Sequence, residues 1–196
     1  FEEKFRIFTS SKYCVAVNSG TSALHLSLIA LGIKEGDEVL LPSISFVASA
    51  AAVTYVGAKP VFVDVDIDTM GLSPSALKTF LKLNTHVKNQ KCINNSTGRV
   101  IKACLPMHTF GNACDIMEIV SISKEFGLMV VEDAAEALGS KSNEKALGTF
   151  GDMGTISFNG NKLITTGGGG AVLCKSKEHA KKIRHISTTA KVNNKY

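Results

Sequence analysis

The sequence is poor in several features that mark particular classes of protein. Its 196 residues include no tryptophan and only four prolines. The longest nearly apolar stretch, residues 46–58, is broken by Ser49 and Thr54 and is too short to cross a bilayer, so we expect no membrane partner. We also expect no secretion signal, because the first residues have the pattern of an amphipathic helix. An initiator methionine is missing, and we expect a fragment at both ends.

Cysteine is present, but not in a pattern that builds a metal or disulfide site. No CxxC pair and no cysteine–histidine ligand spacing occurs, which argues against a zinc site and a disulfide framework. Cys14, Cys104 and Cys174 lie in apolar runs and are predicted to be core thiols, whereas Cys92 and Cys114 stand apart. Free core thiols favour a reducing compartment, and we expect a cytoplasmic protein.

Positive charge is only mildly in excess. The 22 lysines and arginines against 17 acidic residues give a net charge of +5. Basic residues gather between Lys177 and Lys191, but no aromatic side chains are interleaved with them as single-stranded nucleic acid requires. We interpret this segment as a solvated helix face and expect no nucleic-acid partner.

What the sequence does contain is an alternation of short apolar runs with helix-like segments. Strand patterns occur at residues 15–17, 38–41, 60–65, 100–105, 128–131, 155–158 and 171–174. Helical patterns occur at residues 22–31, 46–56, 75–83, 115–126 and 177–186, the third after a Ser73-Pro74 start signal. The polar segment 84–98 predicts a surface excursion or a hairpin.

This alternation predicts an α/β fold with three layers, α/β/α, around a mostly parallel sheet. With 44% hydrophobic residues the chain can bury one sizeable core, so we expect one domain rather than two. Ligands in such sheets bind beyond the carboxyl ends of the strands, which makes the loops after the strands the informative ones.

Lys162 stands in the most informative of these loops. The predicted strand at residues 155–158 is followed by a turn signal at 159–161, and four glycines follow the lysine at 167–170. A lysine at such a junction could form a Schiff base with a carbonyl cofactor. The alternative is a solvated surface lysine.

Three carboxylates, Glu132, Asp133 and Glu136, follow the apolar strand at residues 128–131. A buried carboxylate at the strand end needs a cationic partner, and for Asp133 a protonated pyridine nitrogen would be one. Such a pair keeps the ring an electron sink. A helix N-cap and a magnesium ligand are the alternatives, the second with Glu132 and Glu136 as further carboxylates.

The loop at residues 18–22 is a candidate phosphate cradle. Gly20 allows close approach of an anion, and the amides of the first helical turn would donate to it together with the hydroxyls of Thr21 and Ser22. The loop has neither a Walker pattern nor GxGxxG. Ordinary capping by Ser19 or Thr21 is therefore the alternative.

Three further side chains follow predicted strands. Phe46 could stack on a flat ring or belong to the core. His108 could contact cofactor or substrate, or serve as a local hydrogen-bonding residue. Ser157 offers a second phosphate-binding hydroxyl. Together with Lys162 and Asp133, these residues lie at predicted strand ends, as a single site requires.

Five segments of the chain resemble the DegT/DnrJ/EryC1/StrS sugar aminotransferases, a family of fold-type I pyridoxal-phosphate enzymes. They are residues 18–25, 41–46, 106–111, 132–136 and 157–162, in the family's order. The run 157–170 looks closest to the LegC-like subgroup that aminates UDP-4-keto-6-deoxy-N-acetylglucosamine on the way to bacillosamine or legionaminic acid. The resemblance implies an aspartate aminotransferase-like large domain over residues 1–196, a missing C-terminal small domain, and a homodimer with shared active sites.

The resemblance also implies individual roles. Lys162 forms the Schiff base with pyridoxal 5′-phosphate and then transfers protons, Asp133 pairs with the pyridine nitrogen, and Phe46 stacks on the ring. The position of Glu136 is commonly glutamine in the family and lies close to the ring hydroxyl. Phosphate binding falls to Gly20, Thr21, Ser22 and Ser157.

The implied activity is amino transfer from an amino acid, expected to be glutamate, to a 4-keto-6-deoxy sugar nucleotide, in surface-polysaccharide or nonulosonic-acid sugar biosynthesis. One alternative is a pyridoxal-phosphate sugar dehydratase, whose members carry histidine where Lys162 stands. The other is a non-catalytic regulatory relative, against which the intact set of Lys162, Asp133 and Ser157 argues. The resemblance implies no metal.

Overall fold

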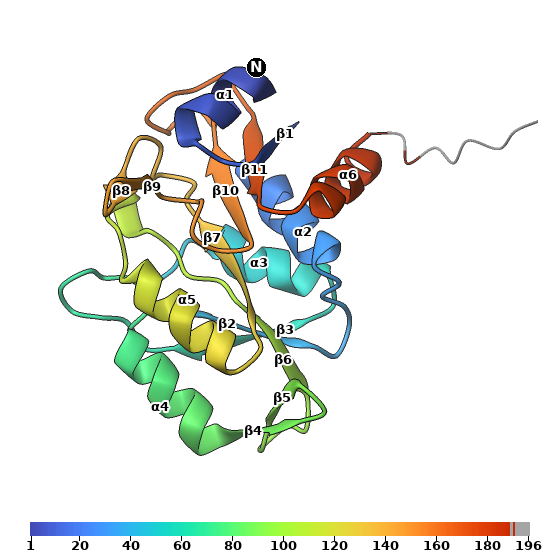
Figure 1. Ribbon diagram of the computed structural model, residues 1–196, viewed down its shortest axis with the longest axis vertical. Coiled ribbons are helices and arrows are strands. Elements are labelled where there is room, and N and C mark those ends of the chain that lie inside the picture. The colour runs from blue at the N-terminus through green and yellow to red at the C-terminus, as the bar shows by residue number, and fades with distance from the viewer. Residues whose placement is uncertain (189, 191–196) are drawn as a thin grey trace, which may run out of the picture.

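A computed structural model describes residues 1–188 and residue 190, and Figure 1 shows the arrangement of their elements. A nine-stranded sheet forms its centre, with the main path β1-β11-β10-β7-β6-β2-β3. The strands of this path are β1 (Tyr13–Val17), β2 (Glu38–Pro42), β3 (Lys59–Val63), β6 (Val100–Cys104), β7 (Met129–Asp133), β10 (Met153–Ser157) and β11 (Gly170–Cys174).

The direction of the strands confirms the prediction of a mostly parallel sheet. The pairs β10–β7, β7–β6, β6–β2 and β2–β3 are parallel. By contrast, β11 lies antiparallel to both of its neighbours, β1 and β10. All the other strands of the path therefore point the same way, and their carboxyl ends meet at one edge of the sheet.

Helices cover both faces, which gives the three predicted layers (Figure 1). They are α1 (Glu2–Thr9), α2 (Gly20–Ala30), α3 (Val47–Tyr55), α4 (Pro74–Asn84), α5 (Ile116–Glu125) and α6 (Lys177–Ile186). Alternate residues of β2 point to opposite faces: Val39 and Leu41 pack with α2, α3 and α6, whereas Leu40 packs with α4 and α5. Each fully buried leucine of this kind stabilises the fold by roughly 1.5–3 kcal/mol.

Several helix boundaries follow from local chemistry, among them the start signal that the sequence showed at Ser73-Pro74. Ser73 caps α4, because its Oγ accepts the Ala76 N–H at 3.3 Å, and Pro74 occupies the first helical position. Gly32 follows α2 with a φ of +76°, and Gly127 follows α5 with a φ of +71°. A left-handed residue of this kind ends a helix at little cost only when it is glycine.

The polar segment 84–98 forms a hairpin of β4 (Thr85–Lys88) and β5 (Lys91–Asn94). Its two turn residues, Asn89 and Gln90, both have positive φ. The hairpin joins the main sheet where β5 pairs with the beginning of β6. This is the end of β6 away from the edge where the parallel strands finish.

The short hairpin β8 (Lys141–Ser142) and β9 (Lys145–Ala146) was not predicted, because two-residue strands carry no readable alternation. The strand expected at residues 60–65 is β3, which ends at Val63.

All five cysteines are buried and free, as predicted for three of them. Lys191 of the basic segment lies outside the described residues. No helix within those residues is long and apolar enough to span a membrane.

Candidate active site

A cavity of about 430 Å³ opens at the carboxyl edge of the parallel strands. Loops from β1, β2, β6, β7 and β10 all contribute to its lining. The predicted site residues among the lining are Gly20, Thr21, Phe46, His108, Asp133, Glu136, Ser157 and Lys162. The fold thus brings together residues that are up to 142 positions apart in the sequence, from Gly20 to Lys162 (162 − 20).

Ser22 is the predicted site residue that does not line the cavity. Its backbone N–H donates to Ser19 Oγ at 3.0 Å, and its hydroxyl accepts a hydrogen bond from the same Ser19 Oγ. Ser19 is therefore the N-cap of α2, the alternative that the sequence left open. Capping and anion binding are compatible here, because Thr21 still faces the cavity.

Lys162 lies in the loop between β10 and β11, and its side chain is only 10% exposed. Its Nζ donates to Glu136 Oε1 at 2.8 Å and lies 5.4 Å from the centre of the Phe46 ring. These contacts place the amine inside the cavity lining rather than in solvent. Of the two interpretations of this lysine, the geometry favours a functional one.

Beside the 18–22 loop, glycine is required at two positions where neighbouring atoms come unusually close. A Cβ on Gly20 would lie 2.8 Å from Ser157 Cβ, and a Cβ on Gly170 would lie 2.6 Å from the Ser19 carbonyl carbon. Real side chains do not tolerate such distances. The first turn of α2 therefore packs directly against the facing ends of β10 and β11, which brings Ser157 beside the 18–22 loop.

Asp133 ends β7 and is 3% exposed. Its carboxylate accepts hydrogen bonds from Ser49 Oγ at 2.5 Å and from the Ala135 N–H at 3.2 Å. Burial raises the pKa of Asp133, while these two donors and the charges of His108 and Lys162 oppose the rise. A buried carboxyl that borders a cavity, and whose pKa is raised by burial and lowered by these neighbours, is suited to pair with a cation.

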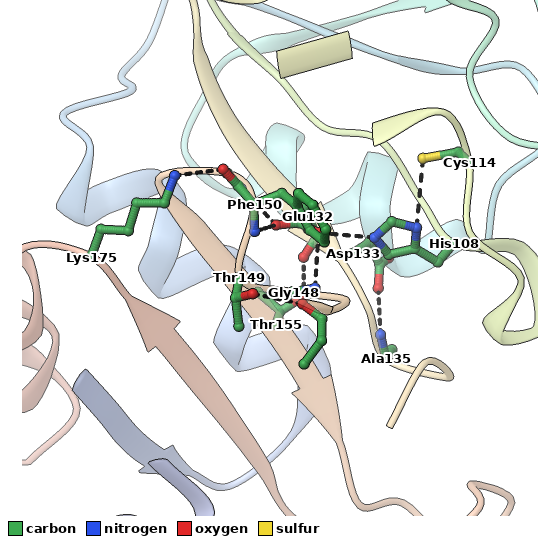
Figure 2. Close-up of polar contacts among 12 residues, drawn as sticks. His108, Cys114, Glu132, Asp133, Ala135, Gly148, Thr149, Phe150, Thr155 and Lys175 are labelled. Carbon is green, nitrogen blue, oxygen red and sulfur yellow. Dashed lines mark hydrogen bonds and ion pairs between the residues drawn. The ribbon is translucent and has the colours of Figure 1, made fainter. Parts of the chain in front are cut away.

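Glu132, the residue before Asp133, is completely buried and makes its polar contacts with a different set of residues (Figure 2). Its Oε1 accepts the N–H groups of Phe150 and Gly151, both at 2.6 Å, and its Oε2 accepts the N–H of Gly148 at 2.8 Å. Glu132 is thus unable to join Asp133 around a magnesium ion. The part of the chain that the structure describes holds no cluster of three or more metal-ligating side chains.

His108 lies next to Glu132 (Figure 2) and is 1% exposed. Its Nε2 is 3.0 Å from Glu132 Oε2, and its Nδ1 is 3.5 Å from Cys114 Sγ. Its backbone N–H donates to the Asp133 carbonyl at 3.0 Å. Both ring nitrogens thus face protein groups although the ring borders the cavity, and a direct contact with cofactor or substrate stays a prediction.

Two lining or supporting residues were not singled out by the sequence. Ser49 is buried in α3, where a small polar side chain among alanines was the only available signal. Met107 Sδ accepts the Phe46 N–H at 3.4 Å and fixes the start of α3 near the cavity. A methionine after a strand gives no indication of such a contact.

Comparison with known proteins assigns the chain to a family. The DegT/DnrJ/EryC1/StrS aminotransferase family matches residues 1–196. The chain belongs to this family. A similar curated relative is the GDP-perosamine synthase of Escherichia coli O157:H7, with 45% identity over 90% of this chain and 44% of the relative. The chain therefore spans less than half the length of this relative.

Solved structures of DegT/DnrJ/EryC1/StrS proteins share the fold. A family aminotransferase from Brucella abortus has a TM-score of 0.88 and 33% identity, over 100% of this chain and 50% of the other. The Escherichia coli GDP-4-keto-6-deoxy-D-mannose-3-dehydratase with bound hydrated pyridoxal phosphate has a TM-score of 0.77 and 30% identity, over 94% of this chain and 44% of the other. Aminotransferases and a dehydratase thus share this α/β architecture.

Proposed function

We propose that the full-length protein is a pyridoxal 5′-phosphate-dependent aminotransferase acting on a 4-keto-6-deoxy sugar nucleotide. The observation that carries the proposal is the presence of two groups in the lining of one cavity: the amine of Lys162, 10% exposed, and the buried carboxyl of Asp133. Residues 1–196 then form its large, cofactor-binding domain, and a smaller C-terminal domain supplies the remainder.

The residues present fit the cofactor in three respects. Gly20, Thr21 and Ser157 line the cavity together at the start of α2, where helix amides concentrate positive charge. Asp133 is a buried carboxyl that accepts two hydrogen bonds from the residues that the structure describes. Phe46, 60% exposed, presents a ring face beside Lys162. Gly20, Thr21 and Ser157 would hold the phosphate.

When bound, pyridoxal phosphate supplies a carbonyl that condenses with amines and a ring that withdraws electrons. Lys162 Nζ would supply the amine for that carbonyl and, when free, would accept at Nζ a proton from the α-carbon of the amino-acid donor. Glu136 accepts a hydrogen bond from this amine and so fixes its position. Asp133 would hold the ring nitrogen in its protonated form. Because Ser49 and Ala135 bind both carboxyl oxygens, Asp133 keeps one orientation throughout.

The amino donor is proposed to be glutamate and the acceptor a nucleotide-linked keto sugar for surface-polysaccharide or nonulosonic-acid synthesis. Two acceptor sugars are candidates. The similarity to a GDP-perosamine synthase favours a GDP-linked sugar, whereas the run 157–170 favours UDP-4-keto-6-deoxy-N-acetylglucosamine. Turnover of GDP-4-keto-6-deoxymannose and of the UDP sugar, each with glutamate, decides between them.

The proposal includes a homodimer with shared active sites. Two apolar side chains of the cavity lining, Phe46 and Phe110, support it, because they are 60% and 86% exposed, and Val47 next to Phe46 is 73% exposed. Apolar surface of this kind beside a site is typical of an interface. Sedimentation of the full-length protein tests the dimer, and a monomer at micromolar concentration would contradict it.

Replacing the lysine tests the central assignment. In the full-length protein, Lys162→Ala is expected to abolish amino transfer and the mass that borohydride reduction otherwise fixes at this residue. Lys141→Ala is the matched control, because the Lys141 side chain is 56% exposed and lies outside the cavity. Normal turnover by Lys162→Ala would refute the proposal. Loss of a hydroxyl from the keto sugar as water, without amino transfer and without the lysine adduct, would instead favour the dehydratase alternative.

A further inference from the structure

The carboxyl of Asp133 accepts hydrogen bonds from two separate parts of the chain. Ser49 lies in the first turn of α3, has no exposed surface, and donates from Oγ to Asp133 Oδ2 at 2.5 Å. The Ala135 N–H donates to Oδ1 at 3.2 Å. One oxygen thus depends on a side chain from another element, and the other depends on the turn that follows β7.

The partner of Ser49 is unusual for a buried helical serine. Such a hydroxyl commonly returns to the carbonyl one turn earlier, as Ser27 Oγ does with Ala23 O at 2.7 Å. Thr54 behaves similarly in α3 itself, with its Oγ1 bonded to Ala51 O at 2.7 Å. Ser49 instead reaches across to the sheet, and so links α3 to the floor of the cavity.

We propose that Ser49 is a positioning residue that fixes the orientation and the ionised form of Asp133 for a bound pyridinium ring. This role rests on the function proposed above. The hydroxyl acts through Asp133, so it shapes the pairing with the ring nitrogen without touching the reacting atoms.

The charges around Asp133 agree with this role. Burial raises the pKa of the carboxyl, and the hydrogen bond from Ser49 is the largest influence opposing that rise. The Ala135 N–H and the charges of His108 and Lys162 oppose it less. Because a protonated carboxyl cannot pair with a pyridinium, loss of the Ser49 hydroxyl moves the loss of cofactor binding to higher pH.

The test measures pyridoxal 5′-phosphate affinity of the cofactor-stripped full-length protein across pH. Ser49→Ala is expected to bind about ten-fold more weakly at neutral pH, since a hydrogen bond to a charged group is lost. The acidic limb of its affinity profile is expected to lie at higher pH than that of the unsubstituted protein. Ser49→Thr keeps the hydroxyl and is expected to restore both, and Ser27→Ala serves as the buried-serine control.

A cofactor analogue separates positioning from a general effect on the fold. In 1-deazapyridoxal 5′-phosphate a carbon replaces the ring nitrogen, so the ratio of affinities between Ser49→Ala and the unsubstituted protein is expected to approach one. An equal loss for both ligands, or an unshifted pH profile, overturns the inference while the proposed function stands. Failure of the unsubstituted protein to bind pyridoxal phosphate overturns the proposed function and this inference together.

Discussion

Two neighbouring carboxylates of β7, Glu132 and Asp133, lie in opposite kinds of environment. Glu132 has 0% exposure and accepts three backbone N–H groups and faces the His108 ring. Asp133 has 3% exposure and accepts two hydrogen bonds beside a cavity. A buried carboxylate surrounded by donors holds the fold together, whereas one with few donors and an open side is prepared to bind a cation.

Glu132 and Asp133 also connect different parts of the molecule. Glu132 ties the 148–151 turn to β7, and through His108 it reaches Cys114 (Figure 2). Asp133 connects α3 to the cavity through Ser49. One carboxylate is therefore expected to govern stability and the other to govern ligand binding, and substitutions can test that division.

The largest expected effect is on the Glu132 side. Glu132→Gln places an amide group among three N–H donors, so we expect the free energy of unfolding to fall by about 3 kcal/mol. Urea denaturation of the full-length protein measures the change. Glu118→Gln, at an exposed position of α5, is the control with little expected change. A loss no greater than that of the control would break the comparison.

A smaller loss is expected from His108→Gln. This change removes one partner of Glu132 and leaves the three backbone donors in place, so we expect a loss of about 1.5 kcal/mol. The same denaturation measures it, with His86→Gln in the exposed hairpin as the control. A loss as large as that of Glu132→Gln would mean that the imidazole, and not the backbone amides, compensates the carboxylate.

The smallest effect on stability, and one of opposite sign, is expected for Asp133→Asn. Because burial raises the pKa of Asp133, the ionised form disfavours folding, and stability of the cofactor-free protein falls as pH rises through that pKa. Asparagine does not ionise, so we expect the free energy of unfolding at neutral pH to rise by on the order of 1 kcal/mol. We also expect the variant to lose cofactor binding. Thermal unfolding at acidic and neutral pH tests it, and destabilisation at neutral pH would contradict the assigned role.

Much of the architecture was predictable because apolar runs and helical periodicity are local. The strands that became β2, β6, β7 and β10 and the cap at Ser73 all follow from such patterns. The antiparallel direction of β11 was not predictable, since periodicity does not report strand direction. It depends on the long loop after Ser157 turning back on itself.

The site was predictable as a set of loops but not as a network. Lys162, Asp133 and Gly20 could be found because each stands at or beyond the carboxyl end of a strand, where ligands bind in such sheets. Ser49 could not, because its importance lies in a contact with a residue 84 positions away. The enclosure of Glu132 likewise depends on a turn folding over it, which no local pattern describes.

The antiparallel placement of β11 has a consequence for how the chemistry can change. Ser157 and Gly170 face each other in register, so the loop carrying Lys162 leaves and re-enters the sheet at one point. A segment closed in this way can be exchanged as a unit, since its replacement does not shift the register of the strands beneath it. A reactive side chain can therefore be gained or lost there while the scaffold persists, which is what one fold needs to serve several reactions.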